Sequence, residues 1–179
     1  MKMNLRGGLK LAAVACLVLV LRAGEAAAQQ SPAPAQRQFV GTWSLVSIQY
    51  VESDGRKVEP FGPGAKGMLF FDDGGRFATQ VMAVDRPRFA SNNRMIGTPE
   101  ENKTVSQRVV AYFGTYTVDE SNHMLTLHIE QSSFPNWNGT DQQRRFAFMG
   151  DELRYTAASS TANPAESAEL VWKRGAAGQ

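Results

Sequence analysis

Cysteine, histidine and long apolar runs are all scarce in this chain of 179 residues. Its one cysteine, Cys16, has no second cysteine with which to form a disulfide. The longest apolar run covers residues 11–21, which is too short for a membrane-spanning helix because such a helix needs about 20 apolar residues. The stability of the domain must therefore come from a packed core.

The first 28 residues have the pattern of a secretory signal peptide. Three basic residues precede the apolar run 11–21, and Ala26-Ala27-Ala28 then supplies the small residues that a signal peptidase requires. We expect export, to the periplasm or outside the cell, after cleavage near Ala28. The apolar run continues past Cys16, whereas a lipid-modified cysteine ends such a run, so we do not expect a lipoprotein anchor there.

Removal of residues 1–28 takes away four basic residues and one acidic residue, which changes the formal net charge from +2 to −1. A near-neutral protein has no strong overall attraction to nucleic acid or to anionic lipid, and we expect neither nucleic acid as a partner nor a transmembrane segment in the mature chain. Residues 29–38 are rich in Gln, Pro, Ala and Ser and are expected to form a flexible leader. Residues 39–174 have the length of one domain, and residues 175–179 are expected to be a disordered tail.

Short apolar segments joined by tight turns fill the region between residues 39 and 174. Alternating segments such as 124–132, and turns such as Asp72-Asp73-Gly74-Gly75, are typical of antiparallel strands. About eight strands are expected, at residues 41–50, 68–71, 76–82, 113–118, 124–132, 143–149, 152–156 and 168–173. Of the two folds that suit such strands, a barrel and a sandwich, we favour the barrel because closure leaves no exposed sheet edge.

One helix interrupts the strands. Thr98 offers a capping hydroxyl, Pro99 suits the first helical position, and Glu100 and Glu101 place acidic groups near the positive end of the helix dipole. The sequence therefore predicts an all-β fold, an antiparallel barrel of about eight strands with one short inserted helix at about 99–111.

Several motifs, in order along the chain, resemble the bacterial lipocalin-like domain family. They are Gly41-Thr42-Trp43, Phe61-Gly62-Pro63, Arg86-Pro87-Arg88-Phe89-Ala90, Gly97-Thr98-Pro99-Glu100-Glu101, Tyr112-Phe113-Gly114-Thr115-Tyr116, and Phe134-Pro135-Asn136-Trp137 with Asp141-Gln142 and Arg144-Arg145. This resemblance covers roughly residues 39–174. It implies a lipocalin-like barrel of the calycin type with a central cavity, in a family that mostly lacks an assigned activity.

The resemblance also implies a structural role for two residues. Trp43 is expected to pack across the barrel floor beneath Arg174 or Lys173, a cation–π contact that contributes ~0.5–2 kcal/mol. In lipocalins the helix follows the last barrel strand, whereas the helix expected here lies in the middle of the chain. The known ligand positions of lipocalins are therefore not transferred to this sequence.

Metal and cofactor sites are not expected. His123 and His128 are five residues apart, and on one strand an odd separation places two side chains on opposite faces. No glycine-rich loop lies between a strand and a helix, so we expect neither a nucleotide site nor any other cofactor.

His128 has two interpretations. It shares one face of strand 124–132 with Glu130, and three apolar side chains occupy the other face. If the apolar set faces the core, as in most strands, His128 is solvated. If the apolar set lies outside under the helix, His128 and Glu130 present a tunable base to the cavity, and Tyr116 is a further proton-handling group. His128 and Tyr116 are candidate ligand-binding residues on the second interpretation.

Two consecutive arginines lie on a later strand. Arg144 shares a face with Phe146 and Phe148, and Arg145 alternates with smaller side chains on the other face. A half-buried arginine needs a carboxylate partner, which either the protein or a ligand can supply. Arg145 is our candidate for contact with a ligand acid, and a salt bridge at the barrel rim is the structural alternative.

Two loops complete the candidate site. Trp137, with Asn136 beside it, lies in a turn-rich loop and is expected either to plug one end of the barrel or to form a lid over a ligand. Arg88 lies in the basic segment 86–89, which either gates an anionic ligand or is simply solvated.

Three functions follow from these expectations. The first is binding of a small hydrophobic or amphipathic molecule in the barrel cavity without chemical change. The second is an isomerase or cyclase that uses His128, Glu130 and Tyr116. The third is a protein-binding or inhibitory module that acts through its loops, with a filled interior and an apolar patch outside.

Overall fold

The computed structural model describes residues 34–160 and 163–175. Its elements are α1 (Pro34–Arg37), β1 (Gly41–Val51), β2 (Lys57–Val58), β3 (Lys66–Phe71), β4 (Arg76–Met82), α2 (Pro99–Gln107), β5 (Val109–Asp119), β6 (Met124–Ser132), the 3₁₀ turn η1 (Pro135–Trp137), β7 (Thr140–Met149), β8 (Glu152–Ser160) and β9 (Asn163–Arg174). The predicted signal peptide, half of the predicted leader (residues 29–33) and residues 176–179 of the predicted tail lie outside the described residues.

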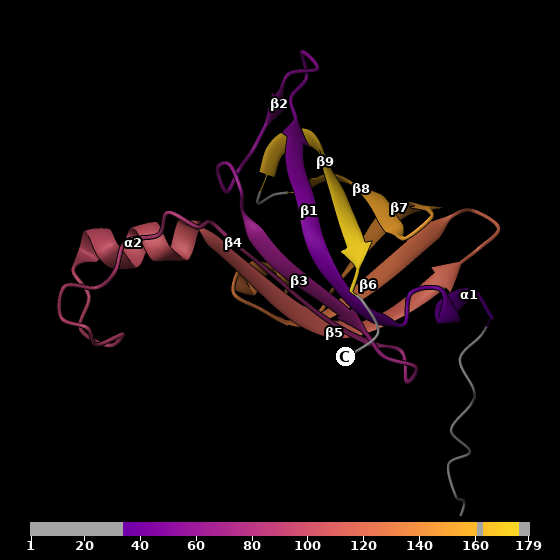
Figure 1. The fold of residues 1–179 in the computed structure, drawn as a ribbon, viewed down its shortest axis with the longest axis horizontal. Helices are drawn as coiled ribbons and strands as arrows, with labels where there is room; N and C mark the ends of the chain where they lie inside the picture. Colours follow the sequence, from indigo (N-terminus) through magenta and orange to yellow (C-terminus); the bar gives the residue numbers. More distant parts are fainter. Residues whose placement is uncertain (1–33, 161–162, 176–179) are drawn as a thin grey trace, which may run out of the picture.

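The strands form a closed eight-stranded antiparallel barrel, as the sequence predicts (Figure 1). Each strand from β3 to β8 pairs with the next along the chain, and β1 pairs with β3 on one side. Closure comes from β1 and β9, which pair from Trp43–Arg174 to Val51–Ser167. The short strand β2 extends the far end of β1 and takes no part in closure.

Some element bounds differ from those expected. The helix ends at Gln107 rather than near residue 111, because Val109 and Val110 pair with β4 and belong to β5. Strands β7, β8 and β9 are also longer than expected, because polar residues at their ends continue the backbone pairing. Pro34–Arg37, inside the predicted flexible leader, forms the one-turn helix α1.

Gly114 is required where β5 and β6 change register. A Cβ atom at Gly114 would lie 1.9 Å from the His128 carbonyl oxygen, closer than any side chain can approach. The bulge lies between Phe113 and Gly114, and beyond it Gly114 pairs with Ile129. A glycine at such a bulge allows the strong bend that a barrel needs.

Aromatic side chains fill one end of the barrel. Phe39 is fully buried there and packs edge-to-face against Phe71, Phe146 and Phe148, with ring centroids 4.9–5.4 Å apart. Trp43 is also fully buried and donates its indole N–H to the Phe39 carbonyl at 2.8 Å. This end of the barrel, which we call the closed end, is a packed aromatic core.

Arg174 covers Trp43, in the arrangement that the family resemblance implies. Its Cζ lies 4.1 Å from the centroid of the Trp43 ring. The guanidinium also donates to the Val40 carbonyl at 2.8 Å and to the Gln38 carbonyl. Gly41 has a φ of +128°, which side chains rarely adopt, and a Cβ there would lie only 3.3 Å from the Arg174 guanidinium.

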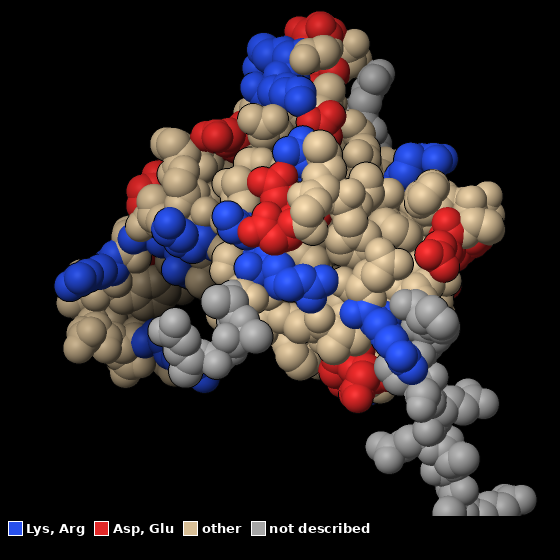
Figure 2. All heavy atoms as spheres, turned by 45° about the vertical axis from the view of Figure 1, so that its right-hand side comes forward, with Lys and Arg blue, Asp and Glu red and all other residues tan. Residues whose placement is uncertain are grey.

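The connection between β4 and β5 projects from the barrel as an arm, which we define as residues 84–107 (Figure 1, left). It ends in α2, whose start follows the sequence prediction: Thr98 and Glu101 form a reciprocal capping box and Pro99 is the first helical residue. No residue of α2 is buried. Basic side chains are visible along the arm in Figure 2.

Candidate ligand-binding site

A cavity of about 410 Å³ occupies the half of the barrel opposite Phe39 and Trp43. Its apolar wall comes from inward-facing residues near the end of β1 and the ends of β4, β8 and β9, where strand alternation directs every second side chain to the lumen. The main lining residues are Ile48, Tyr50, Phe61, Thr79, Val81, Val110, Tyr112, Trp137, Arg144, Tyr155, Ala157, Leu170 and Trp172.

Five polar atoms of the lining are buried without a hydrogen-bond partner in the part of the chain that the structure describes. They are Thr79 Oγ1, Trp137 Nε1, Arg144 Nε, Tyr155 Oη and Trp172 Nε1. A buried polar group without a partner costs about 1–3 kcal/mol, so such groups are almost always paired in native proteins. The two indoles and the guanidinium can only donate, so this lumen is suited to a molecule that brings hydrogen-bond acceptors.

Arg144 is the central group of the cavity. Its side chain comes from β7 and is only 8% exposed. The guanidinium donates to the Gln143 carbonyl at 3.0 Å and to the Gln142 side-chain oxygen. Among the described residues it forms no ion pair with a carboxylate. Because arginine stays protonated at any relevant pH, the lumen contains a buried positive charge that has no counter-ion among the described side chains.

Tyrosines lie close to Arg144 in the lumen. Burial raises the pKa of Tyr155 far above its usual value; Tyr112 adds to this rise, and the Arg144 charge opposes it. Burial, and secondly Tyr112, also raises the pKa of Tyr50. The hydroxyl of Tyr155 lies beside Tyr112 and the Trp172 indole, but without full hydrogen-bond geometry to either. These phenols therefore stay neutral at physiological pH and can donate to an acceptor.

The structure places the sequence-predicted residue Trp137 in the cavity lining. Its ring packs edge-to-face against Tyr112 and Phe134, with centroids 5.5 and 5.7 Å away. The neighbouring Asn136 is exposed on η1 and does not line the cavity. Trp137 is partly buried and packs against the core, and its two expected roles, plug and lid, both stay predictions.

The prediction that Arg145 faces the cavity as a contact for a ligand acid is wrong, because Arg144 lines the cavity and Arg145 does not. Arg145 is exposed on the outer face of β7, whereas Arg144 faces inward with Phe146 and Phe148. The signal was present in the sequence, since the arginine that alternates with phenylalanines must follow them into the core. The same alternation along β8 and β9 could have identified Tyr155 and Trp172, which the sequence reasoning missed.

The interpretation that places His128 and Glu130 in the cavity is also wrong. Leu125, Leu127 and Ile129 are the inward-facing residues of β6, so the more common arrangement applies. His128 is exposed, and its Nδ1 lies 2.6 Å from an Asp141 carboxylate oxygen. Glu130 pairs with Arg76 at 2.9 Å on the same outer face.

Tyr116 faces inward but lies in the closed end of the barrel, outside the cavity lining. Its hydroxyl donates to the Asp72 carbonyl at 2.9 Å, and its ring packs against Phe71. Burial, and then the charges of Asp72 and Asp73, raises the pKa of Tyr116 to about 12. Arg88 is exposed on the arm and is likewise absent from the lining.

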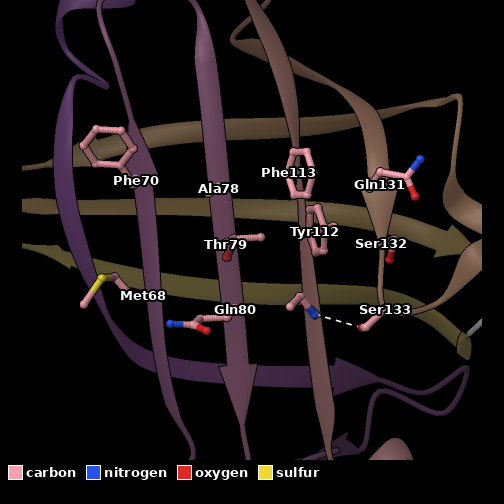
Figure 3. Close-up of a pocket in the computed structure, with 11 residues that line it drawn as sticks. Met68, Phe70, Ala78, Thr79, Gln80, Tyr112, Phe113, Gln131, Ser132 and Ser133 are labelled. Atoms are coloured by element: carbon pink, nitrogen blue, oxygen red, sulfur yellow. Dashed lines mark hydrogen bonds between the residues drawn. The ribbon is translucent and has the colours of Figure 1, made fainter.

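A second hollow of about 530 Å³ lies on the outside of the barrel, over β3 to β6. Figure 3 shows Phe70 and Phe113 on either side of the small residue Ala78, with Met68 nearby. The side chains of Met68, Phe70 and Phe113 are 43–49% exposed. The barrel thus has an interior cavity and also an apolar groove on its exterior.

Two further observations concern the described residues alone. Residues 34–160 and 163–175 contain no group of three or more His, Cys, Asp or Glu side chains placed to hold a metal ion. No helix in this part of the chain is long and apolar enough to cross a bilayer.

Comparison with solved structures gives only low scores. A lipocalin-like protein from Bacteroides uniformis matches with a TM-score of 0.39 and 12% identity, over 76% of this chain and 98% of that one. Fatty-acid-binding protein 1 from Echinococcus granulosus matches with a TM-score of 0.38 and 13% identity, over 78% of this chain and 99% of that one. The REP1-NXSQ fatty acid transporter matches with a TM-score of 0.38 and 10% identity, over 78% of this chain and 97% of that one. Scores this low carry no argument about ligands.

Sequence comparison is more informative. A 4′-hydroxy-3′-methoxypropiophenone carrier protein of Aspergillus oryzae is 33% identical over 82 residues, which is 42% of this chain and 74% of the relative. The sequence pattern of the lipocalin-like domain matches residues 40–175, which is nearly the whole barrel. The chain therefore belongs to the lipocalin-like domain family.

Proposed function

We propose that this protein binds a small amphipathic molecule in its barrel, with an acidic or other acceptor-bearing head group held at Arg144. The observation that carries the proposal is the buried Arg144 guanidinium, which has a free Nε and no carboxylate partner among the described residues. A ligand acid would neutralise this charge and form charge-assisted hydrogen bonds, which are about twice as strong as neutral ones.

The rest of the cavity suits the apolar body of such a ligand. A volume of about 410 Å³ lies in the usual range for sites that hold one small molecule. Leu170, Val81 and Ile48 supply apolar wall, while Trp137 and Trp172 add aromatic surface with a donor on each ring. A body with one or two acceptor atoms would satisfy those donors as well.

A relative's name supports binding without chemical change. The matching Aspergillus oryzae protein is named a carrier of 4′-hydroxy-3′-methoxypropiophenone, which is a small aromatic molecule with oxygen acceptors. The residues that motivated an isomerase or cyclase do not meet in the cavity: His128 and Glu130 are outside the barrel, and Tyr116 lies in its closed end. The proposal is therefore a binding or carrier protein.

The exterior groove between Phe70 and Phe113 is the observation that favours the alternative function, a protein-binding module. The filled interior that this alternative also expects is not found, because half of the lumen is a cavity. Phe113→Ser provides the comparison. Small-ligand binding in the lumen should be unaltered by this change, whereas a protein partner that docks in the groove should lose affinity.

We also propose that the protein is exported. The support is the sequence of residues 1–28, with its basic start, apolar run and small residues before the expected cleavage site. The intact mass of the protein recovered from its own host tests this proposal. A mature chain that begins near Gln29 would support export, and an uncleaved chain in the cytoplasmic fraction would contradict it.

Native mass spectrometry of the protein purified from its own host tests the binding function. We expect a bound small molecule that is released on denaturation, and its exact mass should show at least one acidic or carbonyl oxygen. Arg144→Met should be recovered without this adduct, and the matched variant Arg145→Met should retain it. A ligand-free wild-type protein, or an adduct that both variants retain, would contradict the proposal.

A further inference from the structure

We propose that the arm, residues 84–107, docks on anionic lipid membranes through its exposed tip, and that it brings the open end of the barrel to the membrane surface. The inference goes beyond ligand binding because it identifies where a ligand is collected or delivered. It rests on the apolar tip of the arm, on its unpaired arginines and on its attachment beside the cavity.

The tip exposes two large apolar side chains. Met95 is 77% exposed and Ile96 is 63% exposed, the two highest values among the large exposed apolar residues of the described chain. They are presented by an internally bonded turn: Met95 N donates to Asn93 Oδ1 at 2.9 Å, Ile96 N donates to the Asn93 carbonyl at 3.0 Å, and the Ser91 hydroxyl donates to the Ile96 carbonyl. The apolar pair is thus held outward by local structure.

Three arginines accompany this apolar pair: Arg86, Arg88 and Arg94. None of them forms an ion pair within the described residues. Two of the three acidic residues of the arm are already engaged: Asp85 pairs with Arg108, and the Glu101 carboxylate accepts from Thr98 N and Ala90 N. The loop before α2 therefore has a net positive charge despite the near-neutral charge of the whole protein.

This combination fits an anionic membrane interface. Basic residues near such a surface are attracted to its phosphate groups, and apolar side chains beside them insert into the interfacial region. Arginine suits this position because its guanidinium binds phosphate through two parallel hydrogen bonds. A nucleic acid would offer phosphates but no apolar layer for Met95 and Ile96, and would leave both of them in water.

The base of the arm lies at the open end of the cavity. Ala83 N donates to the Arg108 carbonyl at 3.1 Å and closes the base. The Arg108 guanidinium reaches the Phe61 carbonyl at 3.4 Å, and Phe61 is a cavity-lining residue. The arm is therefore attached at the rim of the cavity, so that docking of its tip would turn this end of the barrel, rather than the closed end, toward the membrane.

Sedimentation with lipid vesicles tests the proposal. The full chain is mixed with vesicles of phosphatidylcholine alone, or of phosphatidylcholine and phosphatidylglycerol in equal parts. We expect binding to the anionic vesicles that weakens with salt and falls by about tenfold or more in Arg88→Gln/Arg94→Gln. Met95→Ser/Ile96→Ser should also reduce binding by about tenfold, because the two exposed apolar side chains that would insert into the membrane are lost.

Matched controls separate the arm from the rest of the surface. Arg145→Gln removes one exposed charge from the barrel wall, and Met149→Ser removes one apolar side chain that is 57% exposed; neither should alter vesicle binding. Equal losses in these controls would overturn the proposal, as would wild-type protein that ignores anionic vesicles. Sedimentation velocity measures self-association of the chain. If the wild type self-associates and Met95→Ser/Ile96→Ser does not, the tip binds a second copy of the chain and the membrane proposal is overturned. Arg144→Met should bind vesicles normally, so failure of ligand binding and failure of membrane docking are distinguishable.

Discussion

Arg144 and Arg145 are consecutive in the chain, yet their side chains lie on opposite faces of β7, one buried in the lumen and one exposed outside. The separation follows from strand alternation alone. It supplies a matched pair of charges on the same element, one in the proposed ligand site and one in solvent. Several experiments can therefore compare the same chemical change in two environments.

Replacing Arg144 with Met should stabilise the ligand-free protein. A buried charge without a counter-ion is unfavourable, and apolar replacements of buried ions are often neutral or stabilising by ~1–4 kcal/mol. Arg145→Met should change the free energy of unfolding by no more than about 0.5 kcal/mol, since it is a surface substitution. Urea unfolding measures the free energy of unfolding of both variants, and an unchanged slope m shows that a shift in midpoint is a change in stability. A clear loss of stability in Arg144→Met would show that this arginine is structural.

Trp137 should report ligand binding. Of the three tryptophans, Trp137 and Trp172 line the cavity, and Trp43 is packed beneath Arg174 in the closed end. Titration with dodecanoate should give a saturable change in tryptophan emission, and Trp137→Phe should remove a large part of that change. If the change is undiminished in Trp137→Phe, the ligand does not pass the open end of the barrel.

Arg174 should contribute to stability through its contacts with the floor. Arg174→Met removes the cation–π contact with Trp43 and the donors to the Gln38 and Val40 carbonyls, so we expect a loss of about 2 kcal/mol. Arg174→Lys keeps the charge but loses the planar guanidinium group, so its loss of stability should be about half that of Arg174→Met. Thermal unfolding of the three proteins measures this order, and equal stability of all three would contradict the assigned role.

Tyr116 should make unfolding sensitive to high pH. Its pKa is raised from 10.0 to about 12 in the folded protein, so the neutral phenol is favoured by folding. Above pH 10 the unfolded chain binds fewer protons than the native one, and the free energy of unfolding falls as pH rises towards 12, by up to about 1.4 kcal/mol per pH unit for this group. Below pH 10 the contribution of Tyr116 to the free energy of unfolding is fully present.

Tyr116→Phe should reduce this slope without abolishing it, because Tyr155 also has a raised pKa. The substitution also leaves the Asp72 carbonyl without the Tyr116 hydroxyl, which should cost about 1 kcal/mol at neutral pH. Chemical denaturation between pH 9 and roughly pH 12 gives the slopes. An unchanged slope in Tyr116→Phe would place the titrating group elsewhere.

Local patterns in the sequence were sufficient for the barrel and for its floor. Alternation identified most strands, the capping residues Thr98 and Glu101 marked the helix start, and Gly41-Thr42-Trp43 marked the closed end. Strand ends were less predictable, because backbone pairing continues through polar residues such as Thr140 and Ser160.

The candidate site was predicted less well, because its residues depend on which face of each strand points into the lumen. Arg145 was chosen over Arg144 as the ligand contact, and His128 was left with two interpretations, although neighbouring apolar residues carried the necessary signal. Tyr112, Tyr155 and Trp172 converge from three strands, of which β5 is far in sequence from β8 and β9. No local motif brings such residues together, so only the closed barrel shows that their polar atoms meet in one cavity.

Calorimetric titration of a charged ligand and its neutral counterpart tests the central claim most directly. Dodecanoate and methyl dodecanoate are titrated into the wild type, Arg144→Met and Arg145→Met. Wild type and Arg145→Met should prefer the acid, and Arg144→Met should lose about 2 kcal/mol or more of affinity for the acid while it binds the ester nearly as before. An acid preference that survives in Arg144→Met would contradict the proposal that this buried guanidinium holds the ligand head group.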